Sequence, residues 1–284
     1  VAPRGTDDDK GWGLYAQDHE ASSVRSRLTT TGSSVERAHG MGVGVAGSDA
    51  TFEGVLVRDT APLASELTFG RGMNFQDNDA TGQRADVTVR GSVLDHNEEV
   101  GLFVAGADAL IEATVVQDTR PGVTMESTGR GAAFQVNSHT LATTSAVVRW
   151  SLIERNHDVG LLVAAADVVI ESTAILDTSS RSVDGGSGDG LAVFHFLLGA
   201  TAEVLDSRIE SSARGGIASF SSEIVLGGTA IVCNDIDLNG EDVDGVPYQF
   251  TDLGGNRCGC AANDAMCRVL SSNLEPPEPS DVEQ

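Results

Sequence analysis

Apolar residues alternate with small or polar ones along most of this chain, in short runs separated by turn-forming residues. The stretches 42–60 (GVGVAGSDATFEGVLVRDT), 101–119 (GLFVAGADALIEATVVQDT) and 160–178 (GLLVAAADVVIESTAILDT) share one such pattern. Alternation with a period of two is typical of β-strands, in which Val, Ile and Thr are favoured. No segment has a helical period, so the pattern predicts an all-β protein with Leu102 and Val104 pointing inward.

A glycine precedes a short apolar strand at regular intervals. These glycines are Gly13, Gly42, Gly72, Gly101, Gly131, Gly160, Gly190 and Gly216. The intervals alternate between 29 and 30 until the last, so each 59-residue unit contains two coils. A fixed period of this size indicates stacked repeats. We therefore predict a right-handed parallel β-helix of about eight coils, spaced ~4.8 Å apart.

Two stretches carry a resemblance to a known family. GSVLDHNEEVGLFVAG (91–106) and WSLIERNHDVGLLVAA (150–165) resemble coils of right-handed parallel β-helix repeat proteins, the architecture of pectate lyases. The two-coil unit is similar to repeats in large secreted proteins of myxobacteria-like bacteria. The resemblance covers about residues 1–235 and implies a fold. It implies no activity, because this fold hosts lyases, hydrolases, adhesins and spacers.

The repeat divides the chain into three parts. Residues 1–232 form the β-helix, residues 233–270 a cysteine-containing cap, and residues 271–284 an acidic, proline-rich tail that we expect to be disordered. The cap should cover the last coil near Ile217 and Ile231, because an open strand edge invites pairing with other chains. The first residues resemble the inside of a later repeat, so we expect further coils on the N-terminal side in a longer parent protein.

All four cysteines, Cys233, Cys258, Cys260 and Cys267, lie in the predicted cap. The apolar anchors expected for this cap are Tyr248 and Phe250. Such clustering favours two disulfides in an exported protein. A zinc site is the alternative, but no His is near and the spacing lacks paired C-x2-C knuckles. The pairing stays open, although a bridge from Cys233 to one of the other three fits the spacing.

Charge limits the partners. The formal net charge of the 284 residues is −24, which repels nucleic acid and anionic membranes. No apolar run is long enough to span a bilayer. The sequence therefore predicts a secreted or cell-surface bacterial protein without a nucleic-acid partner and without membrane insertion.

The pectin-cleaving proteins that this chain resembles carry their catalytic residues on the outward face of the strand after each glycine, or on the turn that follows it. Alternation assigns to the outward face Tyr15, Gln17, Gly44, Ala46, Asn74, Gln76, Phe103, Ala105, Ala133, Gln135, Leu162, Ala164, Ala192, Phe194, Ala218 and Phe220. This set has no carboxylate, Arg, Lys or His, whereas glycoside hydrolysis needs two carboxyl groups and lyase chemistry needs a base. The resemblance thus transfers no catalytic residue.

Polar side chains on this face are candidates for ligand binding instead. They are Tyr15, Gln17, Asn74, Gln76 and Gln135, whose hydroxyl and amide groups suit sugar hydroxyls. Just beyond the strand, Asp77 and Asp79 form the best non-repeated acidic pair (QDNDATG, 76–82). They are the weak candidates for a catalytic or metal-binding role.

One acidic stretch has a partial calcium motif. Asp235, Asp237, Asn239 and Gly240 match the opening of an EF-hand loop. The twelfth position is Val246, where that loop needs a bidentate Glu. The partial match suggests calcium as the cofactor of this protein, and a solvated acidic turn is the alternative.

Long loops should line one side of the column. They span 1–11, 61–71, 120–130 and 179–189, one for every two coils. Loops on a rigid scaffold are common binding sites. We therefore expect a non-catalytic extracellular module, structural or adhesive, whose loop side binds a polysaccharide or a cell-surface protein. The alternative is a carbohydrate-active enzyme, either a polysaccharide lyase or a glycoside hydrolase.

Overall fold

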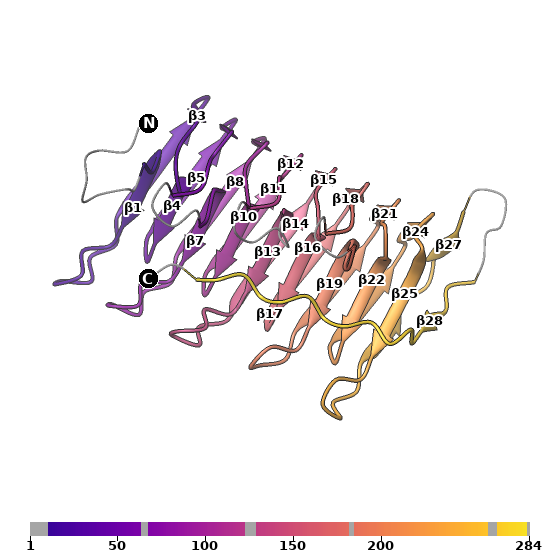
Figure 1. Cartoon of the computed structure of the whole chain (residues 1–284). Coiled ribbons are helices and arrows are strands. Elements are labelled where there is room, and N and C mark those ends of the chain that lie inside the picture. The colour runs from indigo at the N-terminus through magenta and orange to yellow at the C-terminus, as the bar shows by residue number, and fades with distance from the viewer. Residues whose placement is uncertain (1–10, 64–67, 123–128, 182–184, 261–265, 283–284) are drawn as a thin grey trace.

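The structure, a computed structural model, describes residues 11–63, 68–122, 129–181, 185–260 and 266–282. These residues contain no helix, and thus none that is long and apolar enough to cross a membrane. Their strands form three parallel sheets, which the chain visits in turn as it winds through each coil (Figure 1). The predicted parallel β-helix is confirmed.

The first sheet has ten strands and begins each coil. Its strands are β1 (Leu14–Gln17), β4 (Met41–Ala46), β7 (Arg71–Gln76), β10 (Val100–Ala105), β13 (Arg130–Gln135), β16 (Val159–Ala164), β19 (Asp189–Phe194), β22 (Gly215–Phe220), β25 (Ile236–Glu241) and β28 (Val269–Leu270). The eight predicted coils supply the first eight of these strands, and the cysteine-containing segment supplies the last two.

The second and third sheets have nine strands each. The second contains β2 (Arg27–Thr31), β5 (Asp49–Glu53), β8 (Asp86–Arg90), β11 (Asp108–Glu112), β14 (Thr144–Arg149), β17 (Ala166–Glu171), β20 (Thr201–Leu205), β23 (Glu223–Gly227) and β26 (Gln249–Asp252). The third contains β3 (Ser34–Glu36), β6 (Leu56–Arg58), β9 (Val93–Asp95), β12 (Val115–Gln117), β15 (Leu152–Glu154), β18 (Ala174–Leu176), β21 (Arg208–Glu210), β24 (Ala230–Val232) and β27 (Arg257–Gly259).

Inward residues of all three sheets form one continuous core. Leu102 stacks between Met73 and Ala132 of the neighbouring coils, and Val104 stacks between Phe75 and Phe134. These side chains are at most 1% exposed. One coil alone cannot bury such a row, so the register of the stack creates the core.

The repeated glycine has a steric cause. A Cβ on Gly101 would lie 2.5 Å from Val116 Cγ1 and 2.7 Å from the carbonyl oxygen of Gly131. A Cβ on Gly72 would lie 2.7 Å from the side-chain nitrogen of Asn97. The chain passes so close to the next coil here that only glycine fits, which explains the regular spacing in the sequence.

The cysteine-containing segment covers the last predicted coil by continuing its register. Leu238 lies beside Ile217, and Cys258 lies beside Ile231. Two disulfides join Cys233 to Cys260 and Cys258 to Cys267, with no free cysteine among the described residues. The disulfides favour an oxidising environment for this protein.

Residues 271–282, hereafter the C-terminal segment, differ from the disorder that their composition predicted. The segment runs back from β28 along the outer face of the first sheet (Figure 1). There it covers an outer apolar cluster that is separate from the core and includes Phe103, Leu162, Phe194 and Phe220. Val282, at the end of the segment, joins this cluster and is 7% exposed. Burial at this site offsets the ordering cost that the composition suggested.

Candidate functional site

The predicted ligand-binding residues lie together on the outer face of the first sheet. Gln17, Gln76 and Gln135 occupy one column, separated by Ala46 and Ala105. Tyr15 and Asn74 lie in the adjacent column, separated by Gly44. The sequence therefore identified a real row of amides, at intervals of two coils.

Their exposure falls steeply along the row. Tyr15 is 37% exposed, whereas Asn74 is 2% and Gln135 is 1% exposed. The ring of Tyr15 lies 4.5 Å from that of Trp12, and Gln17 donates to Glu20. Gln17 and Gln76 are half-buried, so Asn74 and Gln135 are the members of the row that are closed to a ligand in this structure.

Gln135 is buried because it binds the C-terminal segment. Its Nε2 donates to the carbonyl of Ser280 at 2.7 Å, and its Oε1 accepts from the N–H of Ser280 at 3.0 Å. Asn74 accepts from Arg71 Nη1 at 2.9 Å and donates to Gln76. Asn74 and Gln135 are thus buried with their amide groups bonded to other parts of the protein.

Charged residues that the alternation pattern missed also lie on this face. Arg71 is fully buried, with its Nε and Nη2 donating to Glu99 at 3.1 and 2.8 Å. Arg130 donates to Asp158 at 2.6 Å. Each arginine precedes a glycine of the repeat.

The glycine explains why strict alternation failed there. The register joins Met41 to Arg71 and Val43 to Met73, but leaves Gly42 and Gly72 unpaired. The irregular backbone at the glycine changes the phase of the strand, so Arg71 joins the outer face. The 59-residue spacing of Arg71, Arg130 and Asp189 is a sequence pattern that marks the same column.

Asp189 reverses the sign of charge in that column. It is fully buried and accepts from Arg214 Nη2 at 2.5 Å and from the N–H of Gly215 at 2.9 Å. Burial raises the pKa of the Asp189 carboxyl, and the Arg214 guanidinium opposes that rise. The outer face thus carries paired charges rather than free ones at these positions.

The candidate acids Asp77 and Asp79 lie together beyond β7. Asn137 Nδ2 donates to Asp77 Oδ1 at 2.6 Å and to Asp79 Oδ1 at 3.1 Å, and His139 Nδ1 lies 3.4 Å from Asp79 Oδ2. Asp77 is 1% exposed, and its burial raises the pKa of its carboxyl group. A carboxyl group with a raised pKa beside a second acid can act as a general acid.

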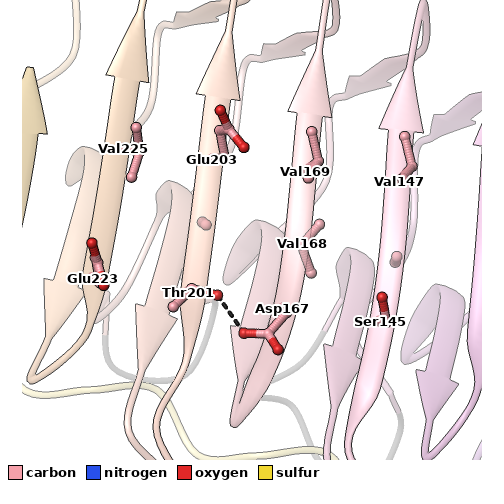
Figure 2. A pocket seen from close by; sticks show the side chains of 11 residues that line it. Ser145, Val147, Asp167, Val168, Val169, Thr201, Glu203, Glu223 and Val225 are labelled. Atoms are coloured by element: carbon pink, nitrogen blue, oxygen red, sulfur yellow. Dashed lines mark hydrogen bonds between the residues drawn. The ribbon is translucent and has the colours of Figure 1, made fainter. Parts of the chain in front are cut away.

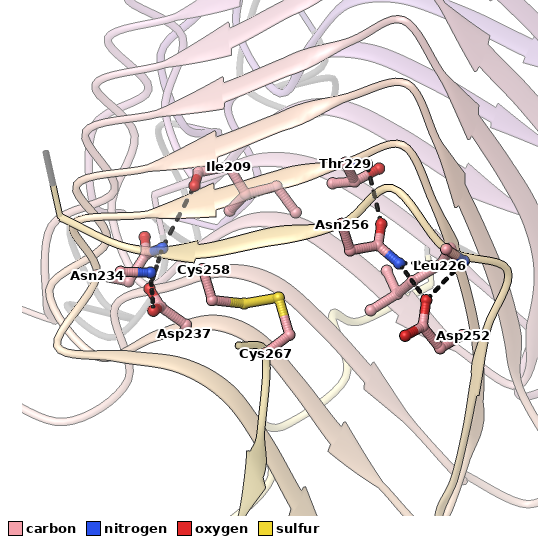
Figure 3. The surroundings of a disulfide bond; sticks show 11 residues. Ile209, Leu226, Thr229, Asn234, Asp237, Asp252, Asn256, Cys258 and Cys267 are labelled. Atoms are coloured by element: carbon pink, nitrogen blue, oxygen red, sulfur yellow. Dashed lines mark hydrogen bonds between the residues drawn. A yellow bond between two sulfur atoms is a disulfide. The ribbon is translucent and has the colours of Figure 1, made fainter. Parts of the chain in front are cut away.

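The candidate calcium ligands lie on or next to a strand of the first sheet. Asp237 Oδ1 accepts from Asn234 Nδ2 at 3.2 Å (Figure 3). Its Oδ2 accepts from the N–H of Gly259 at 2.7 Å. Asn239 donates to Glu241 at 3.0 Å, and Asp235 directly precedes β25. The Asp237 carboxylate thus links two successive coils near the Cys258–Cys267 disulfide.

A different group of possible metal ligands lies where the neighbouring strands β9 and β12 of the third sheet end. Asp95, His96 and Asp118 bring their ligand atoms within 4.8 Å of one another, the one such group among the described residues. Asp118, however, is bound by Arg155 through two contacts of 2.9 Å, and these hydrogen bonds lower the pKa of its carboxyl group. The group is explained by charge pairing between coils.

The second sheet has an open outer face with a shallow groove (Figure 2). The cavity has a volume of about 310 Å³. Val147, Val169 and Val225 line it, together with three carboxylates and two hydroxyl groups. These polar residues are Asp167, Glu203, Glu223, Ser145 and Thr201, and Thr201 donates to Asp167. The groove offers a mixed apolar and acidic surface, which the sequence interpretation did not single out.

The remaining candidate surface was the long loops. Their central residues 1–10, 64–67, 123–128 and 182–184 lie outside the described residues. Comparison of the sequence with protein-family models and with curated proteins gives no match. The fold and the geometry of these surfaces therefore carry the functional interpretation.

Proposed function

We propose that this chain is a non-catalytic β-helix module of a secreted or cell-surface protein, with a structural or adhesive function. The observation that carries the proposal is the covered outer face of the first sheet. On that face, Gln135 and Arg71 bind the main chain of Ser280 and Asp281. The resemblance to pectate lyases implies a substrate on this face, so its occupation supports a role without catalysis.

Charge pairing on the same face supports the same conclusion. Arg71 pairs with Glu99, Arg130 with Asp158, and Asp189 with Arg214. A lyase needs a base and a cation that neutralises the uronate carboxylate. Here the buried cations are already neutralised. The net charge of −24 also repels a polyuronate substrate at a distance.

For adhesion, the open face of the second sheet is the best surface described. Its groove combines valine side chains with the hydrogen-bonding groups of Asp167, Thr201 and Glu203. Carboxylates bind sugar hydroxyls well but repel acidic polymers. The proposed ligand is therefore a neutral polysaccharide, with the predicted loop side as an additional surface.

A co-sedimentation assay with insoluble neutral glucans, xylans and mannans tests this proposal. We expect binding to at least one of them, with a loss of tenfold or more in Thr201→Arg, which fills the groove. Thr29→Arg, on the same face near the N-terminal end, is the matched control and should bind normally. Equal binding by both variants, or no binding by the wild-type protein, would contradict adhesion through this groove.

Asp77 and Asp79 favour the alternative of a carbohydrate-active enzyme, because they are adjacent acids and burial raises the pKa of Asp77. Incubation with uronate and neutral polysaccharides, with and without calcium, separates the two functions. Unsaturated products of a lyase absorb at 235 nm, and a hydrolase creates new reducing ends. We expect neither signal. Turnover that Asp77→Asn or Asp79→Asn abolishes would replace the non-catalytic proposal.

A further inference from the structure

The C-terminal segment is held as a bound peptide would be held. Gln135 pairs with both the N–H and the carbonyl of Ser280. Arg130 Nη1 donates to the hydroxyl of Ser280 at 2.9 Å, and Arg71 Nη2 donates to the carbonyl of Asp281 at 2.5 Å. These contacts recognise an extended main chain and one hydroxyl group. None of them uses an acidic side chain of the segment.

Apolar contacts fix the two ends of the segment. Val282 is buried in the outer cluster that contains Phe103, and Leu274 packs against the same cluster nearer the C-terminal coils. At the start, Glu241 accepts from the N–H groups of Ser272 and Leu274 at 2.7 and 3.2 Å. The segment therefore has an anchor at each end, with main-chain recognition near the second.

The recognition groups are preformed by the sheet. Arg71 is held by Glu99 and Asn74, and its guanidinium carbon lies 3.9 Å from the centroid of the Phe103 ring. Because Glu99 and Asp158 neutralise Arg71 and Arg130, the outer face of the first sheet presents N–H donors without a net positive charge. Such a surface selects carbonyl and hydroxyl oxygens rather than anions.

The prolines of the segment suit an extended conformation. The segment contains Pro276, Pro277 and Pro279, which restrict the unbound chain to such conformations. Arg214, which donates to the carbonyl of Glu275, and Arg71, which donates to that of Asp281, lie five strand spacings apart, about 24 Å. Six residues reach at most about 22 Å, so the segment is extended and the two arginine side chains span the rest.

We infer that the outer face of the first sheet between β7 and β22 is a binding site for extended, proline-containing peptides with a hydroxyl residue two positions before an aliphatic one. Residues 274–282 are its resident ligand. A segment of the same pattern from another polypeptide binds when the resident one is displaced. This site is separate from the groove proposed above for polysaccharide.

The test uses the full chain with its own segment displaced. Ser280→Pro removes the N–H and the hydroxyl that Gln135 and Arg130 bind, and Val282→Glu places a charge in the apolar cluster. The probe is a fluorescein-labelled peptide of residues 274–282 (LEPPEPSDV), followed by fluorescence anisotropy. We expect the double variant to bind it at least tenfold more tightly than the wild-type protein, in which the attached segment competes at a high effective concentration.

Two further variants of the same protein test the peptide-binding face of the first sheet. Adding Gln135→Ala to the double variant should weaken peptide binding by tenfold or more. Adding Gln117→Ala, on the third sheet, should leave it unchanged. Val282→Ala alone should give an intermediate affinity, which keeps the test available if the double variant does not fold. Equal affinities of the wild-type and Val282→Ala proteins, or equal effects of Gln135→Ala and Gln117→Ala, would overturn the proposal.

Discussion

The guanidinium group of Arg71 lies over the ring of Phe103, with its central carbon 3.9 Å from the ring centroid. Both residues are fully buried although both face away from the interior of the coils. The alternation pattern places Phe103 on the outward face, and an outward side chain is ordinarily exposed to solvent. Phe103 is buried instead, because the arginine and the C-terminal segment turn this face of the sheet into a second buried layer.

The burial of Phe103 predicts a large effect of truncation. Phe103→Ala should destabilise the protein by about 3–5 kcal/mol, comparable with a large core truncation. Leu110→Ala, on the open face of the second sheet, is the control and should cost less than about 1.5 kcal/mol. Guanidinium denaturation of both variants measures the difference. Equal costs would mean that the outer face is not covered in solution.

The close approach at Gly101 predicts a steric effect. A Cβ there would lie 2.5 Å from Val116 Cγ1, so Gly101→Ala should cost about 1–3 kcal/mol through overpacking. Gly199 has nothing within 4 Å of an added Cβ, and Gly199→Ala should be neutral or slightly stabilising. Thermal melts of the two variants test this. A loss of stability in Gly199→Ala as large as that in Gly101→Ala would contradict the steric explanation.

The ion pairs of Glu112 predict that the stability of the protein decreases at acidic pH. Hydrogen bonds from Arg90 and Arg149 lower the pKa of its carboxyl group. The stability that this adds is complete above the pKa of the unfolded chain, ~4.3, and is lost as pH falls through the folded value. Glu112→Gln should therefore cost about 1–3 kcal/mol at pH ~7 and progressively less below pH ~4.

Denaturation curves of Glu112→Gln and the wild type across this pH range give the measurement. Glu53→Gln serves as the control, because the Arg90–Glu53 pair is about half exposed and should contribute less than about 1 kcal/mol. A cost for Glu112→Gln that grows as pH falls would be inconsistent with the ion pairs.

Asp77 predicts a pH dependence of stability that is opposite in sign to that of Glu112. Burial raises the pKa of its carboxyl group, so ionising it in the folded protein reduces stability as pH rises from ~3.9 through the folded value. Asp77→Asn keeps an oxygen that can accept from Asn137. The melting temperature of Asp77→Asn should therefore rise relative to that of the wild type as the pH is raised from acidic to neutral. A melting temperature of Asp77→Asn that falls relative to that of the wild type as pH rises would show that Asp77 is stabilised as a carboxylate.

The disulfides predict a local response to reduction. Each should contribute about 2–4 kcal/mol, mostly to residues 233–270, whose few apolar side chains give limited packing. Limited proteolysis with and without reductant should show faster cleavage in this range, with the coils before residue 232 still protected. Unchanged cleavage after reduction would show that stacking on Ile217 and Ile231 suffices to hold this segment.

The sequence by itself determined the coils. Period-two alternation and the glycine interval are consequences of stacking, because each coil must repeat its inward row and leave the same space for the next. Leu102, Val104 and Gly101 could therefore be placed without a structure. The clustering of cysteines after the last repeat likewise predicted the disulfides, while the pairing of Cys233 with Cys260 depended on which strands meet.

Only the tertiary structure decided what covers the column. Arg71 lies on the outer face because the unpaired glycine beside it shifts the strand, an effect that alternation alone does not contain. The C-terminal segment has a composition typical of disorder, and its order comes from contacts with Gln135 and Arg130, which are about 145–150 residues away in the chain. Local sequence patterns report local periodicity, whereas contacts of this kind depend on two distant segments meeting in the folded protein.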